Sequence, residues 1–383
     1  MKKPKSATRS NDHLLVSAVV CFATATVWSR LSLPSADGLS ITTFNMLAAV
    51  HRSVPNIIGT ETPYEELDDF RESDCESWWR PRAKNIAMYI AEELSSSDLI
   101  LLQEWWTRPE FVKLFDECTH HIFGRVSHQR PGLVRGKPRE DGMAVLVNKK
   151  SRLEMVDSNR IVTAPGRIAQ IIHCREKNAG RSLFLGNAHL SFPGGQDPVK
   201  NERRQAYEVH LVARALARAG QENSFYGDDG SHLEILAGDF NSNSLALASC
   251  ILERRPYYFA NCMSAKAFQS MASSVGGEID LGVTHRTHLG QEVSVDHLFA
   301  RFVRSNGDPA MKNGLLKMGY LDSTGVQVVD CQKKHISFEN ERLLSDHRPV
   351  TARLDWDPKP LDLKLPNIHE INSLHPLQSP WDT

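Results

Sequence analysis

Short apolar runs alternate with longer amphipathic stretches along the chain from residue 39 onward. The apolar runs predict strands over 39–44, 99–103, 142–148, 167–174, 182–190, 233–240, 293–302 and 348–356. Helical patterns fall over 81–95, 108–117, 199–219 and 243–254. Several of the strand runs are apolar almost throughout, as expected when a sheet is covered on both faces. The pattern therefore predicts an α/β fold.

The same pattern divides the chain into one large domain and two flanking segments. Polar, glycine-rich sequence at 125–140 and 220–231 predicts loops, and the sequence contains no internal repeat. A chain of 383 residues that is 41% hydrophobic can bury a large core. We predict one domain over 38–357, preceded by a segment at 1–37 and followed by a proline-rich tail at 358–383.

The N-terminal segment resembles a targeting sequence. Basic residues precede an uncharged, largely apolar run over 14–28. This run is short for a spanning helix and suits a signal-peptide core, with Ala23 and Ala25 near a cleavage point. A signal anchor, with Trp28 and Arg30 at its edge, is the rival interpretation and would allow membrane contact. Both indicate the secretory pathway, a membrane or an organelle, and the sequence leaves a cytoplasmic location open.

Net charge and cysteine content exclude few classes of substrate and no cellular compartment. The formal net charge is -1, so no global basic field attracts nucleic acid, and such a substrate would need a local patch. The basic segment 130–139 is either that patch or a solvated loop, and the acidic segment 61–76 indicates a surface loop or short helix. Of the 7 cysteines, Cys21 lies in the N-terminal segment. The others form no CxxC pair, and their redox state stays open.

Polar side chains sit repeatedly where the predicted strands end. Strand ends that face the same rim converge in space, so these residues can gather in one crevice. Carboxylates and amides of this kind suit Mg²⁺ or Mn²⁺, whereas zinc would prefer a set richer in histidine or cysteine. The residues are Asn45, Glu104, His189, Asp239, Asn241, Asp296, His297, Ser345, Asp346 and His347.

Each of these residues also has a purely structural interpretation. Asp239 and Asn241 could cap the helix predicted at 243–254, although Ser242 or Asn243 is better placed to do so. Glu104 could be an exposed acid at a strand end. For these three residues we favour the chemical role.

The histidines divide between the two interpretations. His189 could be a satisfied core histidine, but we favour function. His297 follows Asp296, and strand alternation points it to the opposite face, so we expect a structural role. The same argument separates Ser345, which we expect to support its loop, from His347.

Five further residues could meet substrate phosphate. Arg167 in "GRIAQ" and Thr284 and His285 in "VTHRTH" are candidates to reach substrate, and Arg167 and His285 are the candidate substrate-binding residues. Arg80 and Arg82 begin a predicted helix, and packing beside the adjacent tryptophans is an equal alternative.

Six ordered segments resemble the signatures of the endonuclease/exonuclease/phosphatase superfamily: "TTFNML", "LLQEW", "NAHLSF", "LAGDFNS", "VDHLF" and "SDHRPV". The resemblance covers about residues 39–355. "NAHLSF", "DGMAVLV" and "GRIAQII" are most similar to the deadenylase branch that includes nocturnin and angel proteins. The resemblance implies a four-layered α/β sandwich of two packed mixed sheets flanked by helices, with the site at one end.

The resemblance also implies a metal site. Glu104 would be the principal Mg²⁺ ligand, helped by Asn45 and Asp346. In-line attack at phosphorus builds negative charge, which a metal, imidazoles and amides offset. Mn²⁺ is the alternative cofactor.

Catalytic roles follow from the same resemblance. Asp239 would orient and deprotonate the attacking water, and Asn241 would hold that water or a phosphoryl oxygen. His189 would stabilise the developing charge. His347 would contact the scissile phosphate or transfer a proton, with its other ring nitrogen oriented by Asp296.

The implied function is a metal-dependent phosphodiester hydrolase, a 3′–5′ exoribonuclease similar to the deadenylases, with RNA or a nucleotide as its partner. Two enzyme alternatives stay open: a phosphatase acting on a nucleotide or other small phosphate, and a sphingomyelinase-like lipid phosphodiesterase, to which the N-terminal segment lends weight. An inactive binding module would lack one of Glu104, Asp239, Asn241 and His347, and all are present. No protein partner can be inferred.

Overall fold

The computed structural model describes ten stretches of the chain. They are residues 38–53, 70–134, 136–194, 197–223, 232–242, 269–270, 284–287, 291–303, 327–333 and 344–355. The segment 1–37, most of the acidic segment 61–76, the predicted helix 243–254 and the tail 358–383 lie outside them. No helix within the described stretches is long and apolar enough to cross a membrane. Cys75, Cys118 and Cys174 are free thiols.

The first sheet is six-stranded and mixed, in the order β15-β16-β1-β2-β6-β3. β1 and β2 run parallel, and the other neighbouring pairs are antiparallel. The strands are β1 (Leu39–Asn45), β2 (Leu99–Trp106), β3 (Phe123–Gln129), β6 (Asp141–Asn148), β15 (Gln327–Lys333) and β16 (Val350–Asp355).

The second sheet is also six-stranded and mixed, in the order β11-β14-β10-β9-β8-β7. Here β9 and β10 form the parallel pair. The strands are β7 (Leu153–Ala164), β8 (Arg167–Glu176), β9 (Ser182–His189), β10 (His232–Asp239), β11 (Gln269–Ser270) and β14 (Asp296–Val303). Two short antiparallel pairs accompany the sheets: β4 (Leu133–Val134) with β5 (Lys137–Pro138), and β12 (His285–Arg286) with β13 (Glu292–Val293).

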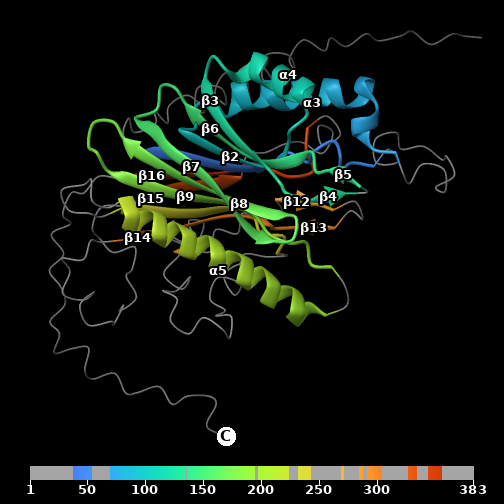
Figure 1. Ribbon diagram of the computed structural model, residues 1–383. Coiled ribbons are helices and arrows are strands. Elements are labelled where there is room, and N and C mark those ends of the chain that lie inside the picture. Colours follow the sequence, from blue (N-terminus) through green and yellow to red (C-terminus); the bar gives the residue numbers. More distant parts are fainter. Residues whose placement is uncertain are drawn as a thin grey trace, which may run out of the picture. The chain divides into compact units, whose positions relative to one another are not determined.

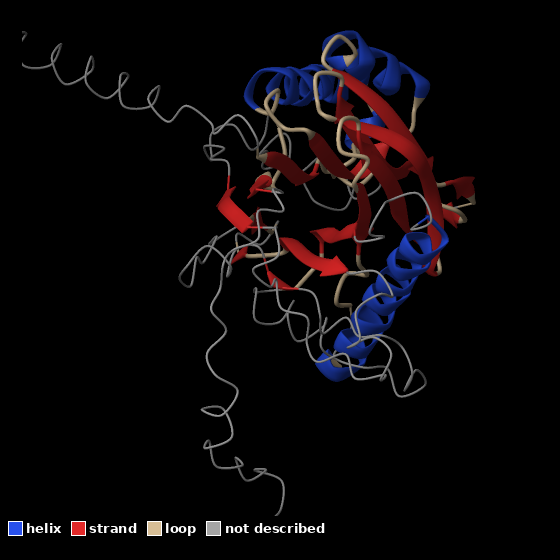
Figure 2. Cartoon of the chain, turned by 90° about the vertical axis from the view of Figure 1, so that its left-hand side faces the viewer, coloured by secondary structure: helices blue, strands red, loops and turns tan. Residues whose placement is uncertain are grey.

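Helices cover the outer face of each sheet (Figure 1). A short 3₁₀ turn, η2 (Glu72–Asp74), leads into α3 (Glu76–Glu93), which packs with α4 (Pro109–Thr119) on the first sheet. α5 (Pro198–Asn223) packs on the second sheet. An apolar cluster drawn from both sheets fills the space between them, so the strands lie between two helical layers (Figure 2). The predicted four-layered α/β sandwich is confirmed.

A buried pair of amide side chains links the two sheets across the apolar space between them. Gln103 of β2 donates from Nε2 to Oδ1 of Asn187 in β9 at 2.7 Å. Asn187 in turn donates to the carbonyl oxygens of Leu102 and Ala144 at 3.1 and 3.2 Å. Buried amides need such partners, so sliding one sheet against the other would leave them unsatisfied. The link therefore fixes the position of His189, two residues beyond Asn187, relative to Glu104.

The predicted central strands are present, and α3, α4 and α5 match the predicted helices 81–95, 108–117 and 199–219, whereas the edges of the sheets differ from the prediction. The loop predicted over 125–140 is wrong in part, because its beginning forms β3 and its later residues form the β4–β5 pair. The edge strands β7 and β15 were not predicted, and β7 exposes much of its length. Edge strands are more exposed and need fewer apolar residues, so they lack the apolar runs that predicted the central strands. α5 extends to Asn223, into the loop predicted over 220–231.

Candidate active site

The polar residues that follow the central strands meet around the end of β10. Asp239, the last residue of β10, pairs in register with His189 of β9 on one side and with Asp296 of β14 on the other. Asn45, at the end of β1 in the facing sheet, donates from Nδ2 to Oδ2 of Asp239 at 2.9 Å. The two sheets thus bring together residues that lie far apart in the sequence.

Asp239 faces two imidazoles. Its Oδ2 lies 3.6 Å from Nε2 of His189 and 3.8 Å from Nε2 of His347. Burial raises the pKa of Asp239 to about 6, and the charge of Asp296 adds to the rise, while His347, Asn45 and the backbone N–H at position 241 oppose it. A carboxylate whose pKa lies just below neutral is suited to accept a proton from water.

The close approach of β9 explains the glycine before Asp239, and the turn after β10 positions Asn241. Gly238 has a φ of 140°, and a Cβ there would lie 1.8 Å from the carbonyl oxygen of Ala188. Asn241, at a φ of 48°, donates its backbone N–H to Oδ1 of Asp239 at 2.8 Å. Its side-chain Nδ2 donates to the carbonyl oxygen of Leu190 at 2.8 Å. An amide nitrogen carries two hydrogens, so the second can reach a substrate oxygen.

A β-bulge aims Glu104 into the site. The register between β2 and β6 shifts between Gln103 and Trp105, which leaves Glu104 as the extra residue at a φ of 53°. Strain of this kind in a non-glycine residue is typical of functional positions. Glu104 accepts hydrogen bonds from Asn45 Nδ2 at 3.2 Å and from the backbone N–H of Ala48 at 3.1 Å. Burial alone would raise the pKa of Glu104, but positive neighbours outweigh it and lower the pKa.

Asn45 is oriented to position carboxylates. Its Nδ2 contacts both Glu104 and Asp239, while its Oδ1 accepts the backbone N–H of Leu47 at 2.9 Å. Asn45 was predicted to be a metal ligand, which requires its oxygen. In this orientation the oxygen is turned toward Leu47, so Glu104 and Asp346 are the better candidates for direct ligation.

His347 is paired with a buried carboxylate. Its Nδ1 donates to Oδ2 of Asp296 at 2.9 Å, and both side chains are buried. Burial alone would lower the pKa of His347, but the charge and hydrogen bond of Asp296, together with Asp239 and Asp346, raise it to about 10. His347 is therefore a cation at neutral pH, with Nε2–H directed toward Asp239.

His189 has the opposite kind of partner. Arg130 donates from Nη2 to Nδ1 of His189 at 2.6 Å, so the ring is neutral and carries its hydrogen on Nε2. Burial and the positive charges of Arg167 and Arg130 hold the pKa of His189 well below its ordinary value. Arg130 is held in turn by Asp141, whose Oδ2 lies 2.7 Å from Nη1. His51 contacts the same carboxylate at 3.1 Å.

Asp346 is available to a metal ion. Its Oδ1 is buried and accepts no hydrogen bond from any residue of the described stretches. Burial raises the pKa of Asp346 and the charge on Glu104 adds to the rise, while His347 opposes it. A divalent cation would offset the repulsion between the two carboxylates, and carboxylate oxygens are ligands that hard divalent cations prefer. The residues present therefore fit such an ion. Asp239, Asp296 and His347 also bring ligand atoms within 4.8 Å of one another.

Comparison with known proteins identifies the fold. No family model matches the chain, and no curated protein matches it in sequence. A solved endonuclease/exonuclease/phosphatase from Bacteroides vulgatus superposes with a TM-score of 0.52 at 17% identity, over 84% of this chain and 99% of that chain. The chain has the endonuclease/exonuclease/phosphatase fold. A humanized D. rerio TDP2 gives a TM-score of 0.50 at 16% identity, over 83% of this chain and 99% of that chain. The similarity to the nocturnin and angel branch stays a prediction.

Within this endonuclease/exonuclease/phosphatase fold, the two candidate substrate-binding residues flank the carboxylates. Nη1 of Arg167 is buried without a hydrogen-bond partner among the residues that the structure describes. Burial and Arg130 lower the pKa of Arg167 to about 10, so its guanidinium stays charged at neutral pH and can meet an anion. His285 stacks on His347 with ring centroids 4.1 Å apart. Burial and the charge of His347 lower the pKa of His285 to about 3, so this ring is neutral.

Three residues with weaker sequence signals are structural. Arg82 donates to Glu72 and to the carbonyl oxygens of Leu47 and Leu344, and so ties together two loops of the site. Ser345 donates to the carbonyl oxygen of Asn45 at 2.8 Å, which is the loop support that was expected. His297 packs against Phe240 and Phe299 on the face of β14 opposite Asp296, as predicted. Arg80 is exposed and pairs with Glu76.

Three residues of the site were not predicted from the sequence: Arg130, Asp141 and His51. Arg130 was assigned to a basic surface segment, but its side chain is buried against His189. Asp141 directly precedes the apolar residues of β6, which is the same polar-at-strand-end signal that identified Asp296. That signal could have found Asp141, whereas nothing in the local sequence marks His51.

Proposed function

We propose that the chain is a metal-dependent phosphodiester hydrolase. The observation that carries the proposal is the position of Asp239 between a neutral and a charged imidazole, 3.6 and 3.8 Å away. A carboxylate that can take a proton, a cation that can contact phosphate and a neutral N–H donor are the groups that hydrolysis of a phosphate ester needs. Glu104 and Asp346 lie next to this group with oxygens suited to a cation.

The residues divide the reaction between them. Asp239 orients a water molecule and takes its proton as the water oxygen attacks phosphorus. The ester P–O bond breaks, and the leaving oxygen takes up a proton from solvent. His347 donates Nε2–H to a phosphoryl oxygen, and Asp296 holds the ring in place. His189 donates from Nε2 to the charge that develops on phosphate. Asn241 offers its second amide hydrogen to the water or to a phosphoryl oxygen.

The proposed cofactor is Mg²⁺, with Mn²⁺ as the alternative. Glu104 and Asp346 would hold it, and a bound cation would polarise a phosphoryl oxygen and offset its charge. The carboxylate donor set supports this choice, because Mg²⁺ binds through one or two carboxylates together with water and substrate phosphate.

The proposed substrate is the 3′ end of RNA, shortened in the 3′–5′ direction. The support is the resemblance of "NAHLSF", "DGMAVLV" and "GRIAQII" to the deadenylase branch. The buried cation of Arg167 beside the carboxylates also fits a phosphate backbone. Contact with a membrane through residues 1–37 is a separate proposal, and it is the feature that would favour a lipid substrate.

The test compares four substrates in the presence of Mg²⁺: 3′-adenylated RNA, NADPH, a nucleoside monophosphate and sphingomyelin. Glu104→Ala removes the principal ligand, and Glu110→Ala, on the exposed side of α4, is the matched control. Stepwise shortening of RNA that is lost in Glu104→Ala and retained in Glu110→Ala is the expected result. Release of product only from a small phosphate or a lipid would contradict the RNA proposal. Activity that survives Glu104→Ala would contradict the metal site.

A further inference from the structure

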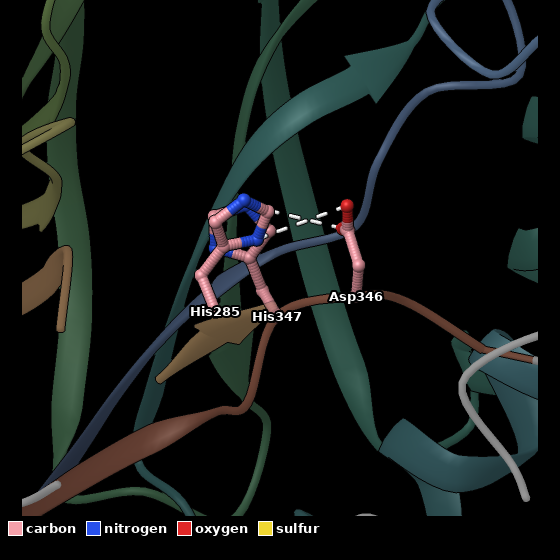
Figure 3. A group of neighbouring side chains, drawn as sticks. All are labelled: His285, Asp346 and His347. Carbon is pink, nitrogen blue, oxygen red and sulfur yellow. Dashed lines mark ion pairs between the residues drawn. The ribbon is translucent and has the colours of Figure 1, made fainter. Parts of the chain in front are cut away.

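Two histidines face each other beside the proposed magnesium site. His285 of β12 forms an isolated antiparallel bridge with His347. Backbone hydrogen bonds flank the bridge, from Arg286 N–H to the carbonyl of Asp346 at 3.0 Å and from Arg348 N–H to the carbonyl of Thr284 at 2.7 Å. Residues directly opposite in such a pair project from the same face, so the two rings are held together by the backbone. Figure 3 shows them stacked, with the carboxylate of Asp346 beside both.

The three side chains bring possible ligand atoms close to one another. Nδ1 of His285 lies 3.7 Å from Oδ2 of Asp346, and Nε2 of His347 lies 3.9 Å from Oδ1 of Asp346. All three ligand atoms fall within 4.8 Å of one another. Zinc bonds of about 2.0–2.2 Å in a tetrahedron separate the ligand atoms by roughly 3.3–3.6 Å. Small side-chain movements would therefore close the set around one ion.

Two of the ligand-bearing groups have unused polar atoms. Nδ1 of His285 and Oδ1 of Asp346 are both buried, and neither has a hydrogen-bond partner within the described part of the chain. Buried polar atoms without partners are costly, and a metal ion would satisfy them. This observation is independent of the distances between the residues.

Asp296 completes the pattern of a transition-metal site. It accepts the hydrogen bond from Nδ1 of His347 at 2.9 Å, so Nε2 becomes the ligand once zinc has displaced its proton to solvent. Histidine ligands in proteins almost always make such a contact through their other nitrogen. Two imidazoles and one carboxylate suit zinc better than magnesium, which prefers oxygen.

We propose that His285, Asp346 and His347 form a zinc-binding site, and that zinc bound there inhibits the hydrolase. Inhibition follows because zinc would engage Asp346, which the proposed magnesium site needs, and Nε2 of His347, which the proposed reaction needs. Binding of zinc does not depend on the proposed function, whereas inhibition rests on it.

The first experiment measures zinc affinity of the full chain by competition with a chromophoric chelator. Loss of a group that only hydrogen-bonds to a metal ligand weakens metal binding by about 10–100-fold. His285→Asn removes a ligand itself, so we expect the affinity for zinc to fall by at least about 100-fold. The matched control is His121→Asn, in the exposed pair His120–His121, where two imidazole rings also lie together, with centroids 6.1 Å apart. Unchanged affinity in His285→Asn, or a loss in His121→Asn instead, would overturn the proposal.

The second experiment needs no variant. Cobalt in a four- or five-coordinate nitrogen and oxygen site gives visible absorption bands, which zinc should abolish by competition. Wild-type protein that binds cobalt only in a six-coordinate, weakly absorbing form would contradict the site. Because this measurement uses wild-type protein, it decides the site even if His285→Asn does not fold.

The third experiment measures turnover with Mg²⁺ while zinc is added, as a ratio to turnover without zinc in each protein. The zinc concentration for half inhibition should rise in His285→Asn by the same factor as the affinity falls. Inhibition at the same concentration in both proteins would contradict the inhibitory role. Absence of turnover on every substrate would contradict the proposed function, while the affinity and cobalt results would still decide the site.

Discussion

His189 and His347 approach the same carboxylate oxygen of Asp239 from two sides, yet their partners differ in sign. Nδ1 of His347 faces the carboxylate of Asp296, whereas Nδ1 of His189 faces the guanidinium of Arg130. The pKa of His347 is therefore raised to about 10, and that of His189 lies well below its ordinary value. One residue type thus supplies both a cation and a neutral donor, because the group behind each ring sets its charge.

This difference assigns separate tasks to the two sides of the site. The side of His347 binds and neutralises negative charge. The side of His189 donates a hydrogen bond without a second positive charge, which would lower the pKa of Asp239 and make it a weaker base. The residues behind the rings are accordingly as important as the rings themselves.

The largest loss of turnover is expected at Asp239, which lies between His189 and His347. Asp239→Asn removes the carboxylate that both rings face and leaves no group to take the proton from water. Turnover should fall by on the order of 10³–10⁴, at the upper end of the contribution of a general base. Asp157→Asn on the exposed edge strand β7 is the control, and equal losses in steady-state turnover of the two variants would contradict the assignment.

Asp296→Asn should remove the difference in charge between His347 and His189. The amide keeps the shape of the carboxylate but not its charge, so the pKa of His347 should fall from about 10 toward its ordinary value. Turnover at neutral pH should drop by on the order of 10²–10³, as for loss of one group that stabilises charge at phosphate. Steady-state rates decide the outcome, and a variant as active as the wild type would show that the charge on His347 is not needed.

The dependence of turnover on pH should show the titration of both Asp239 and His347. Asp239 acts unprotonated, so turnover should rise as pH increases through about 6. His347 acts protonated, so turnover should fall as pH increases through about 10. The two groups interact, so these values belong to the pair as a whole. In Asp296→Asn the alkaline limb should move to lower pH, and an unmoved limb would assign it to another group.

The smallest effect on activity is expected at His297, the neighbour of Asp296 on the opposite face of β14. Its Nε2 contacts Ser242 Oγ at 3.2 Å and the carbonyl of Ser294 at 3.1 Å, away from Asp239. His297→Phe should leave turnover nearly unchanged while it lowers the free energy of unfolding by about 1–3 kcal/mol through unsatisfied partners. Chemical denaturation beside steady-state rates measures both. A large loss of activity in a folded variant would contradict the structural role.

The fold could be predicted from sequence in its centre and not at its margins. Central strands such as β10 are buried on both faces and show long apolar runs, which marked them clearly. The edge strand β7 is largely exposed along its length, and β3 is mostly half-buried, so neither carries that signal. The pairing of these edges depends on their neighbours in the sheet, which local sequence does not contain.

The site divides in a similar way. Asp239, Asp296 and His347 follow or begin recognisable strands, and the structure places all three together. The bulge that turns Glu104 inward and the guanidinium that fixes His189 depend on tertiary contacts. Arg130 lies in a segment rich in glycine, proline and basic residues, which is the composition of a surface loop. Only the folded chain shows that this side chain is buried.

The most direct test of the central claim is the protonation state of the two rings at neutral pH. Nitrogen-15 NMR of the imidazoles, assigned with His189→Asn and His347→Asn, reports which nitrogens carry hydrogen. We expect two protonated nitrogens in His347 and a neutral His189 with its hydrogen on Nε2. Both rings in the same charge state, or a hydrogen on Nδ1 of His189, would contradict this expectation.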